Sequence, residues 1–442
     1  PTVVPIPGMT DQRGLERFVD VVDLGSVERQ PSDPVEPPAV DPPAGEEPPG
    51  GEEPSGGTGT DSLWIPVEPA RIFDSRVGGD TIDGLDEAGG RLSADSEVTI
   101  DVAGRAGVPL DAQAVIANVT AIQSPGTGFA TVHACETPRP WTASLNYSAG
   151  VNLGNEVIAS LGGVGELCVY TSESIEMTVD VVGYVPATSP YEPVVPARLL
   201  DTRAGGDTID GAFAGIGRAG PGGTIELDVV GRGGVIGDVA AVVMYIGAVQ
   251  GASVGYVTAW DCDGDPPNAS SLNHVAGINR GNEVVVAPSG DGRMCLFTSA
   301  DVDLTVDVVG VLPVGVDGLT MLDDPSRLVD SRPGHSTVDG LHAASGVWGA
   351  GEVREIQIGG RAGVPGDAET VAMTITAVQG AGIGWATVFA SNGDVPNASS
   401  VNFVPGVNGG NEIIAGLDDA GRICVFTSVG THLTVDVTAA TS

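Results

Sequence analysis

The sequence predicts an all-β protein of three tandem antiparallel β-sandwich domains, jelly-roll-like in topology, preceded by an extended N-terminal arm. Three observations lead to this prediction. One closing stretch occurs three times, with Cys168, Cys295 and Cys424 at equivalent places. Glycine (66 residues) and proline (32) are abundant and aromatic residues make up only 4%, which is typical of short strands joined by turns. Short apolar runs are separated by Gly, Pro, Asp and Asn.

The three copies keep the same internal spacing. The motif Pro-x-Arg-x-x-Asp-Ser/Thr-Arg begins at Pro69, Pro196 and Pro325, and its aspartate always lies 106 residues before the aspartate of the closing stretch. This long period favours globular beads on a string over a solenoid with one shared core. The expected divisions are an arm and linker at residues 1–60 and three domains at residues 61–188, 189–315 and 316–442.

Eight strands are expected in the first copy, each bounded by turn residues. The first carries the Arg/Asp motif, the middle ones are apolar or alternate with period two, and the last two form the closing stretch. Eight short strands favour a two-sheet sandwich, with a closed barrel as the alternative. The expected ranges are residues 71–76, 97–102, 114–122, 128–134, 143–147, 156–161, 166–171 and 175–185.

Residues 1–60 differ from the rest of the chain. The segment 34–59 is rich in Pro, Glu and Gly and too poor in apolar residues to fold alone, so we expect an extended linker. Two short apolar runs precede it and are candidates to add as strands to a neighbouring subunit's sheet. The expected assembly residues are Thr2, Val3, Val4, Ile6, Val19, Val21, Val22 and Leu24. The start at Pro1, without a charged and apolar leader, fits a processed protein as well as a cytosolic one.

The chain is strongly acidic, with a formal net charge of −39 and a pI near 4.1. This balance argues against nucleic acid as a partner, because a phosphate backbone is bound by a concentrated Lys/Arg surface. All 19 basic residues are arginine, so chemistry that needs a lysine nucleophile and crosslinks through lysine are excluded. No window of about 18 apolar residues occurs, and we expect no membrane span.

Cysteine spacing indicates the redox compartment. Cys135 and Cys168 lie 33 residues apart, and Cys262 and Cys295 repeat that spacing. Two such pairs predict structural disulfides in an oxidising compartment, with buried free thiols as the alternative. In the third copy the partner position of Cys424 is a serine, so we expect Cys424 to be a free thiol. The final hairpin is then the one most available to a neighbouring subunit.

Arginine and aspartate form the most repeated charged set. The second aspartate of each copy lies within an apolar run, where a carboxylate needs a hydrogen-bonded, charged partner, and the arginine motif is the obvious donor. We therefore expect a structural network. The alternative is an anion or sugar-acid site, since arginine binds carboxylates bidentately. The set comprises Arg71, Asp74, Arg76, Asp180, Arg198, Asp201, Arg203, Asp307, Arg327, Asp330, Arg332 and Asp436.

Short acidic loops offer weak candidates for a metal site. Asp80 and Asp83, matched by Asp207 and Asp210, could hold Ca²⁺, which takes about six to eight oxygen ligands. Asx-turns are the favoured interpretation because the spacing matches no EF-hand or nonapeptide calcium repeat. The run 261–265 is a further oxygen cluster, found in one copy only. No other cofactor is expected.

The motifs together resemble a known family. The Arg/Asp motif, the central run 117–121, the Pro-Asn-Ala-Ser-Ser-x-Asn segment at 396–402 and the closing Val-Asp-Val-Val-Gly-Tyr at 179–184 are similar to the repeat domain of secreted and cell-surface proteins of actinobacteria. The resemblance covers residues 64–442 and implies extracellular β-domains without an assigned activity. The third copy departs from it by lacking one cysteine and the closing Val-Gly-Tyr.

We therefore expect a secreted structural protein rather than an enzyme. It would be a subunit of a non-covalent filament, sheath or surface layer, joined to other copies of itself by exchange of the N-terminal arm. The alternative is a cell-surface adhesin or carbohydrate-binding module array, with cell envelope or glycans as partners. Such an array would carry exposed aromatics at one place in every copy. Phe129, Tyr256 and Trp385 occupy such a place but begin strands, where we expect core or rim positions.

Overall fold

The computed structural model of the chain describes residues 4–10, 16–19, 62–390 and 394–442. These residues form 26 strands joined by turns and loops, without a helix. The prediction of an all-β protein is thereby confirmed. Within these ranges, then, no helix is long and apolar enough to cross a membrane.

Two strands belong to the N-terminal arm. β1 (Val4–Thr10) and β2 (Glu16–Val19) pair with each other in antiparallel fashion, with Val4 opposite Val19. Of the expected assembly residues, Val4 and Ile6 lie in β1 and Val19 lies in β2. The other five lie outside the described residues: Thr2, Val3, Val21, Val22 and Leu24.

Each repeat contributes eight strands. Repeat 1 contains β3 (Ile65–Asp74), β4 (Ser96–Asp101), β5 (Ala114–Ile122), β6 (Gly128–Ala134), β7 (Leu145–Tyr147), β8 (Leu153–Ser160), β9 (Glu166–Thr171) and β10 (Glu176–Val185). Repeat 2 contains β11 (Glu192–Asp201), β12 (Gly223–Asp228), β13 (Val239–Val249), β14 (Gly255–Trp260), β15 (Leu272–His274), β16 (Arg280–Val286), β17 (Arg293–Thr298) and β18 (Asp303–Pro313). Repeat 3 contains β19 (Leu319–Asp330), β20 (Glu352–Gln357), β21 (Thr370–Val378), β22 (Gly384–Ala390), β23 (Val401–Phe403), β24 (Gly409–Gly416), β25 (Arg422–Thr427) and β26 (His432–Thr441).

The first strand of repeat 1 is the element whose prediction differs most from the structure. β3 begins at Ile65, six residues before the expected start at residue 71, and it includes Pro66 and Pro69. Proline cannot donate to a strand ladder and is therefore confined to edge strands. β3 satisfies that condition because it is an edge of its sheet and pairs only with β10.

The strand order within a repeat is that of a jelly roll. One sheet of repeat 1 runs β3-β10-β5-β8 and the other runs β4-β9-β6-β7. With the strands of a repeat numbered one to eight, these orders are 1-8-3-6 and 2-7-4-5, and repeats 2 and 3 follow the same two orders. In each repeat, side chains from both sheets form one hydrophobic cluster.

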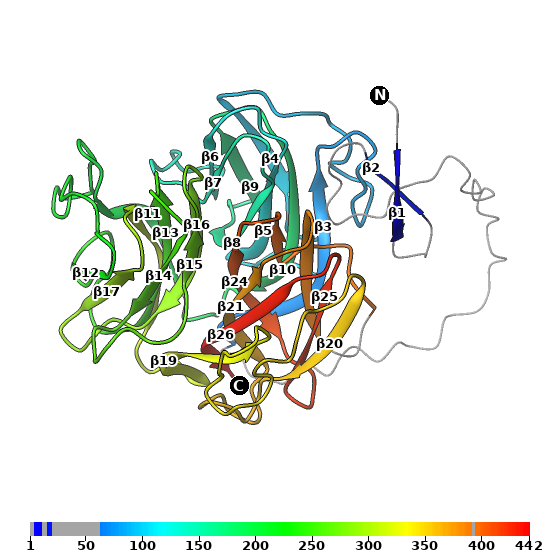
Figure 1. The fold of residues 1–442 in the computed structure, drawn as a ribbon. Coiled ribbons are helices and arrows are strands. Elements are labelled where there is room, and N and C mark those ends of the chain that lie inside the picture. Colours follow the sequence, from blue (N-terminus) through cyan, green and yellow to red (C-terminus); the bar gives the residue numbers. More distant parts are fainter. Residues whose placement is uncertain (1–3, 11–15, 20–61, 391–393) are drawn as a thin grey trace, which may run out of the picture.

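The expectation of separate beads on a string is wrong. A fourth hydrophobic cluster joins all three repeats and includes Ile116, Val243 and Ala372 from equivalent places in the three copies. β8, β16 and β24 contact one another there. Figure 1 shows the three repeats, coloured blue to cyan, green, and yellow to red, grouped around a common centre rather than in a row. The three repeats therefore form one block with an approximate threefold axis.

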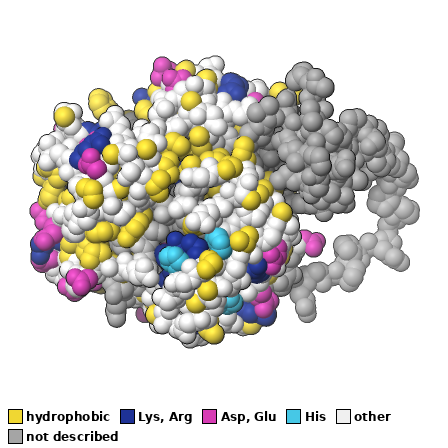
Figure 2. Space-filling model, viewed as in Figure 1, with side chains coloured by type: hydrophobic (Ala, Val, Ile, Leu, Met, Phe, Trp, Pro, Cys, Tyr) yellow, Lys and Arg dark blue, Asp and Glu magenta, His cyan; other side chains and the backbone are white. Residues whose placement is uncertain are grey.

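The start of repeat 1 contacts repeat 3 and so helps to hold the block together. Trp64 is buried in the shared cluster, and its indole Nε1 donates to Thr370 Oγ1 of repeat 3 at 2.6 Å. On the face shown in Figure 2, Asp and Glu side chains gather near the rim, while a band of hydrophobic side chains crosses the middle.

Candidate functional site

Each repeat contains a buried arginine–aspartate network, which we call the clasp. In repeat 1, Arg71 Nε and Nη2 donate to the two oxygens of Asp180 at 2.7 and 3.0 Å. Arg76 Nε and Nη2 donate to the two oxygens of Asp74 at 2.9 and 2.6 Å. All four side chains are buried. The equivalent contacts join Arg198 with Asp307, Arg203 with Asp201, Arg327 with Asp436 and Arg332 with Asp330.

The clasp carboxylates also reach into the neighbouring repeats. Asp180 Oδ2 accepts the backbone N–H of Ser399 from repeat 3 at 3.1 Å. Asp436 Oδ2 accepts the N–H of Ser270 from repeat 2 at 3.2 Å, and Asp307 accepts a backbone hydrogen bond from Ala143 of repeat 1. In each copy, the residue just before a Ser-x-Asn motif (residues 144–146, 271–273 and 400–402) therefore donates its N–H to the clasp of the next repeat. These bonds form a closed ring of three.

A second ring is built by the repeated Gly-Asn-Glu motif. Between repeats 1 and 2, Asn155 Oδ1 accepts the N–H of Glu283 at 3.2 Å, and Glu283 Oε1 accepts the N–H of Ile158 at 2.7 Å. The same reciprocal pair of bonds joins repeats 2 and 3 through Asn282 and Glu412, and repeats 3 and 1 through Asn411 and Glu156. The motif thus specifies contact between repeats, a role that was not expected from the sequence.

The three glutamates of this ring are shielded from water. Burial raises the pKa of Glu283 to about 8 and that of Glu412 to about 7. Burial also raises the pKa of Glu156 well above its ordinary value, and the nearby Glu283 and Glu412 add to that rise. A carboxyl group in an apolar site is easier to bury neutral than charged. The ring therefore holds protons that free glutamates would release near pH 4.5.

In the acidic loops considered for calcium, the second aspartate binds an arginine side chain. Both oxygens of Asp83 accept from Arg105, at 2.6 and 2.9 Å, and Asp83 also accepts the N–H of Leu85 as in an Asx-turn. These bonds lower the pKa of Asp83 to about 2. Asp210 has the same relation to Arg232. Among the described residues, no group of three or more His, Cys, Asp or Glu side chains fits a metal ion.

The other two candidate loop residues have different surroundings. Asp207 Oδ1 accepts the N–H of the next residue, Thr208, at 3.0 Å. Asp80 is exposed. Neither residue joins a larger set of oxygen ligands in the described part of the chain. The geometry at these loops therefore favours turns over a calcium site.

Four cysteines form two disulfides. Cys135 pairs with Cys168 and Cys262 pairs with Cys295. Two intrachain disulfides indicate an oxidising compartment. Cys424 is a free thiol and is only 7% exposed, and burial raises its pKa.

The third hairpin is not open to a neighbour in the way that the sequence suggested. β26 lies inside its sheet and pairs with β19 on one side and β21 on the other. The last strand of the chain therefore has no free edge. The expectation of an available hairpin is therefore wrong. Whether a strand has a free edge depends on its position in the sheet and not on the missing disulfide.

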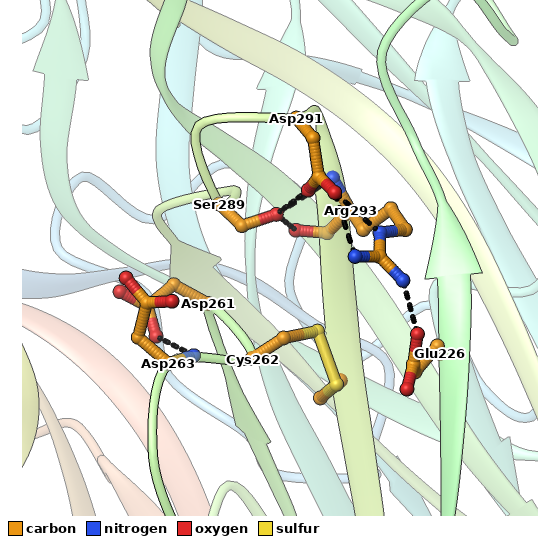
Figure 3. Close-up of a disulfide and its surroundings, with 8 residues drawn as sticks. Glu226, Asp261, Cys262, Asp263, Ser289, Asp291 and Arg293 are labelled. Atoms are coloured by element: carbon orange, nitrogen blue, oxygen red, sulfur yellow. Dashed lines mark hydrogen bonds and ion pairs between the residues drawn. A yellow bond between two sulfur atoms is a disulfide. The ribbon is translucent and has the colours of Figure 1, made fainter.

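The unrepeated acidic run 261–265 forms a turn beside the second disulfide. The N–H of Asp263 donates to Asp261 Oδ1 at 2.9 Å next to Cys262 (Figure 3). On the neighbouring hairpin, Arg293 contacts both Asp291 and Glu226 (Figure 3). The carboxylates of Asp261, Asp291 and Glu226 are thus engaged in turn and ion-pair contacts.

The matched aromatic positions do not form a repeated binding surface. Phe129 and Tyr256 are 37% and 39% exposed, but Trp385 is only 5% exposed. Each ring packs in a tilted arrangement on an aromatic ring of the adjacent strand: Tyr170, Phe297 and Phe426. Rim packing accounts for these residues, and an array of three identical carbohydrate sites is not supported.

The largest hollow among those found lies between repeats 1 and 2. This groove has a volume of about 810 Å³ and is lined by the 138–142 loop of repeat 1 and by residues 195–209 of repeat 2. Trp141 at its wall is 98% exposed. Arg139 stacks on Tyr170 at 3.6 Å, and the clasp residues Arg198 and Arg203 line the opposite side. This junction thus places an exposed indole near several guanidinium groups.

Comparisons with known proteins do not assign the chain to a family. No protein-family model matches it, and no curated protein matches it. Similar solved structures include the N-terminal CBM22-1–CBM22-2 tandem domain of Xyn10C from Paenibacillus barcinonensis, at 10% identity over 56% of this chain and 98% of that one, with a TM-score of 0.17. Two others are Sulfolobus turreted icosahedral virus, at 9% identity over 86% and 90% with a TM-score of 0.18, and an archaeal virus protein described as a triple jelly roll, at 9% over 85% and 91% with a TM-score of 0.17. Scores this low support no inference about the function of the chain.

Proposed function

We propose that the protein is a secreted structural subunit that assembles non-covalently with copies of itself into a filament, sheath or surface layer. One observation carries the proposal. The repeated polar motifs are used inside the block: the clasps and the Asn/Glu ring bind the repeats to one another. The repeated motifs therefore hold the three repeats together as one unit, which is what a structural subunit requires. The two disulfides fit an extracellular setting.

We propose that the N-terminal arm adds to the edge of a sheet in a neighbouring chain. An added strand needs an edge with free N–H and C=O groups. The edge strands β3, β11 and β19 contain prolines, which block such pairing. The edges β8, β16 and β24 meet at the common centre, and the edges β7, β15 and β23 each contact a strand of a neighbouring repeat. The outer edges β4, β12 and β20 of the other sheets are therefore the proposed acceptors for a strand from a neighbouring chain.

Charge sets the conditions for assembly. At a net charge of −39, subunits repel one another strongly at low ionic strength. Salt screens this repulsion, with a Debye length of about 10 Å at 0.1 M. We therefore expect polymers to form in salt or with divalent cations and to dissociate at low ionic strength.

Deletion of residues 1–30 tests the proposal. Electron microscopy and sedimentation should show polymers of the full chain in salt and only single blocks of the shortened chain, with an unchanged thermal unfolding profile as the control for folding. Hydrogen exchange of the polymer should show added protection in β4, β12 or β20. Polymers formed by the shortened chain would contradict the role of the arm, and a full chain that stays monomeric with salt and calcium would contradict the proposed function.

The groove between repeats 1 and 2 favours a second candidate, binding of an acidic glycan. A flat, exposed indole stacks well on a sugar ring, and arginine recognises carboxylates. Binding at this junction would make the protein an adhesin rather than a building unit alone. Trp141→Ala should then abolish binding to uronic-acid polymers on a glycan array. Tyr256→Ala, which alters a partly exposed aromatic outside the groove, should leave that binding intact; equal binding by wild type and Trp141→Ala excludes this candidate.

A further inference from the structure

The groove between repeats 1 and 2 exposes a group of large apolar side chains. Trp141, Val195 and Ile209 line it and are 98%, 71% and 61% exposed. Exposed apolar side chains that gather in one place mark a surface for a binding partner. Prolines line the groove as well: Pro138, Pro140 and Pro196.

The same groove is less acidic than the rest of the chain. Three arginines and two aspartates line it, whereas the whole chain has 19 basic and 58 acidic residues. The exposed Arg139 stacks on Tyr170 at 3.6 Å. On the other wall, Arg203 donates to Asp201 through Nε and Nη2, and its side chain is 39% exposed. Asp207 is the other aspartate of the lining. The groove therefore suits an apolar partner that also carries carboxylates.

A segment of the chain itself has this composition. Residues 34–54, which lie outside the described residues, contain eight prolines and six carboxylates and no arginine. Proline-rich segments favour the extended polyproline II conformation and dock in aromatic-lined grooves at a low cost in conformational entropy. The run 37–43, Pro-Pro-Ala-Val-Asp-Pro-Pro, has two proline pairs with an aspartate between them. It is complementary to the groove in both apolar character and charge.

This segment is tethered close to the groove. The carbonyl oxygen of Leu63 accepts from Ser189 Oγ at 2.7 Å. Val195 on the groove wall follows Ser189 by six residues, which span at most about 22 Å. The eight residues from Pro54 to Ser62 span up to about 29 Å, so the segment can reach the groove of its own chain. A short tether gives an effective concentration on the order of millimolar, which favours the chain's own segment over that of another chain in dilute solution.

We propose that residues 34–54 dock in the groove between repeats 1 and 2 of their own chain. The proline rings of the run 37–43 pack on the indole of Trp141, and the carboxylates of the segment lie beside Arg139 and Arg203. Docking goes beyond the proposed function because it needs no second subunit. It joins repeats 1 and 2 from outside and sets the direction in which the N-terminal arm leaves the block. An acidic glycan would have to displace the segment to bind there.

Tryptophan fluorescence of the full chain tests the proposal. Among the described residues, Trp141 is the one exposed tryptophan, and the other four are at most 5% exposed. Quenching by acrylamide therefore reports access to Trp141. Serine at positions 37, 38, 42 and 43 should raise the quenching constant about twofold over the wild type, because a segment tethered at millimolar effective concentration occupies its groove most of the time. Pro31→Ser changes a proline outside the segment and should behave as the wild type, whereas Trp141→Phe should lose the quenchable signal.

A second substitution tests the contribution of charge. Arg139→Gln should raise quenching in the wild type and leave the four-serine variant unchanged, since that variant has no docked segment to release. Equal quenching of the wild type and the four-serine variant overturns the proposal. Protection of Trp141 that increases with protein concentration would assign the segment to another chain and also contradicts it. The measurement is made at low ionic strength on chains that sediment as single blocks, so its failure leaves the proposed assembly in salt unaffected.

Discussion

The buried glutamate ring predicts a stability that falls as pH rises, and Glu283→Gln is the sharpest perturbation of it. Glu283 Oε1 accepts the N–H of Ile158 across the boundary between repeats 1 and 2. Glutamine keeps that acceptor and the size of the side chain but cannot ionise. The variant therefore removes only the titration and leaves the contact in place.

The magnitude follows from the pKa of Glu283, which burial raises from 4.5 to about 8. The folded state then binds more protons than the unfolded state between these two pH values, so its stability falls as pH rises. This contribution is present in full below pH 4.5 and is lost as pH rises to about 8. At about 1.4 kcal/mol per pKa unit, the loss between pH 5.5 and pH 8 amounts to about 3 kcal/mol. Glu156 and Glu412 change stability in the same direction.

Urea unfolding at pH 5.5 and pH 8 measures the effect. The wild type should lose stability between the two conditions, and Glu283→Gln should lose about 3 kcal/mol less. Glu192→Gln alters an exposed glutamate at the start of β11 and should behave as the wild type. If Glu283→Gln keeps the full pH dependence of the wild type, the carboxyl group is not held neutral in the ring and the reasoning fails.

Three further predictions concern the clasps and the cysteines. Asp180→Ala should lower the free energy of unfolding by about 3–5 kcal/mol, because it leaves Arg71 buried without its partner and removes the acceptor for Ser399, whereas an unchanged midpoint in urea would contradict a structural clasp. Reduction of the disulfides should lower stability by about 2–4 kcal/mol for each bridge, measured by thermal unfolding with and without dithiothreitol, and equal curves would show that the bridges do not constrain the chain. Cys424 should react with a thiol reagent only under denaturing conditions, and rapid reaction of the folded protein would place the thiol at the surface.

Much of the architecture of one repeat could be predicted from sequence. Three strands of repeat 1 have the expected bounds at both ends: Ala114–Ile122, Gly128–Ala134 and Glu166–Thr171. Each is an apolar or alternating run between turn residues, where pattern and packing agree. The arginine–aspartate contacts were expected because a carboxylate inside an apolar strand requires a charged partner. β3 was placed too late because its prolines suggest a loop unless the strand is known to be an edge.

The arrangement of the repeats was harder to predict. Every residue of β5 is buried, which means that the outer face of its sheet is covered as well as the inner one. The continuous apolar run 114–117 was a signal of such double burial. A glutamate next to an apolar run in all three copies, at the fourth position of β8, β16 and β24, was a second signal. Neither signal identifies the repeats that are in contact, because the hydrogen bond between Glu283 and Asn155 joins residues 128 positions apart.

The buried arginine at the start of β16 gave no signal in the sequence. Arg280 is unrepeated and follows a turn, so its pattern is that of a surface arginine. Its burial depends on the approach of repeats 1 and 3, which only the structure shows. The groove at Trp141 could not be predicted either, because its two walls come from different repeats and the tryptophan alone indicates no site.

Small-angle X-ray scattering of residues 62–442 tests the central claim most directly, since that claim is that the three repeats form one block around a common axis. A compact body of this length has a radius of gyration of about 21 Å. Three separate repeats in a row would give a value above about 30 Å by the same scaling. We expect a value close to 21 Å that does not change with salt. A value above 30 Å, with the profile of an elongated chain of domains, would contradict the ring of contacts between the repeats.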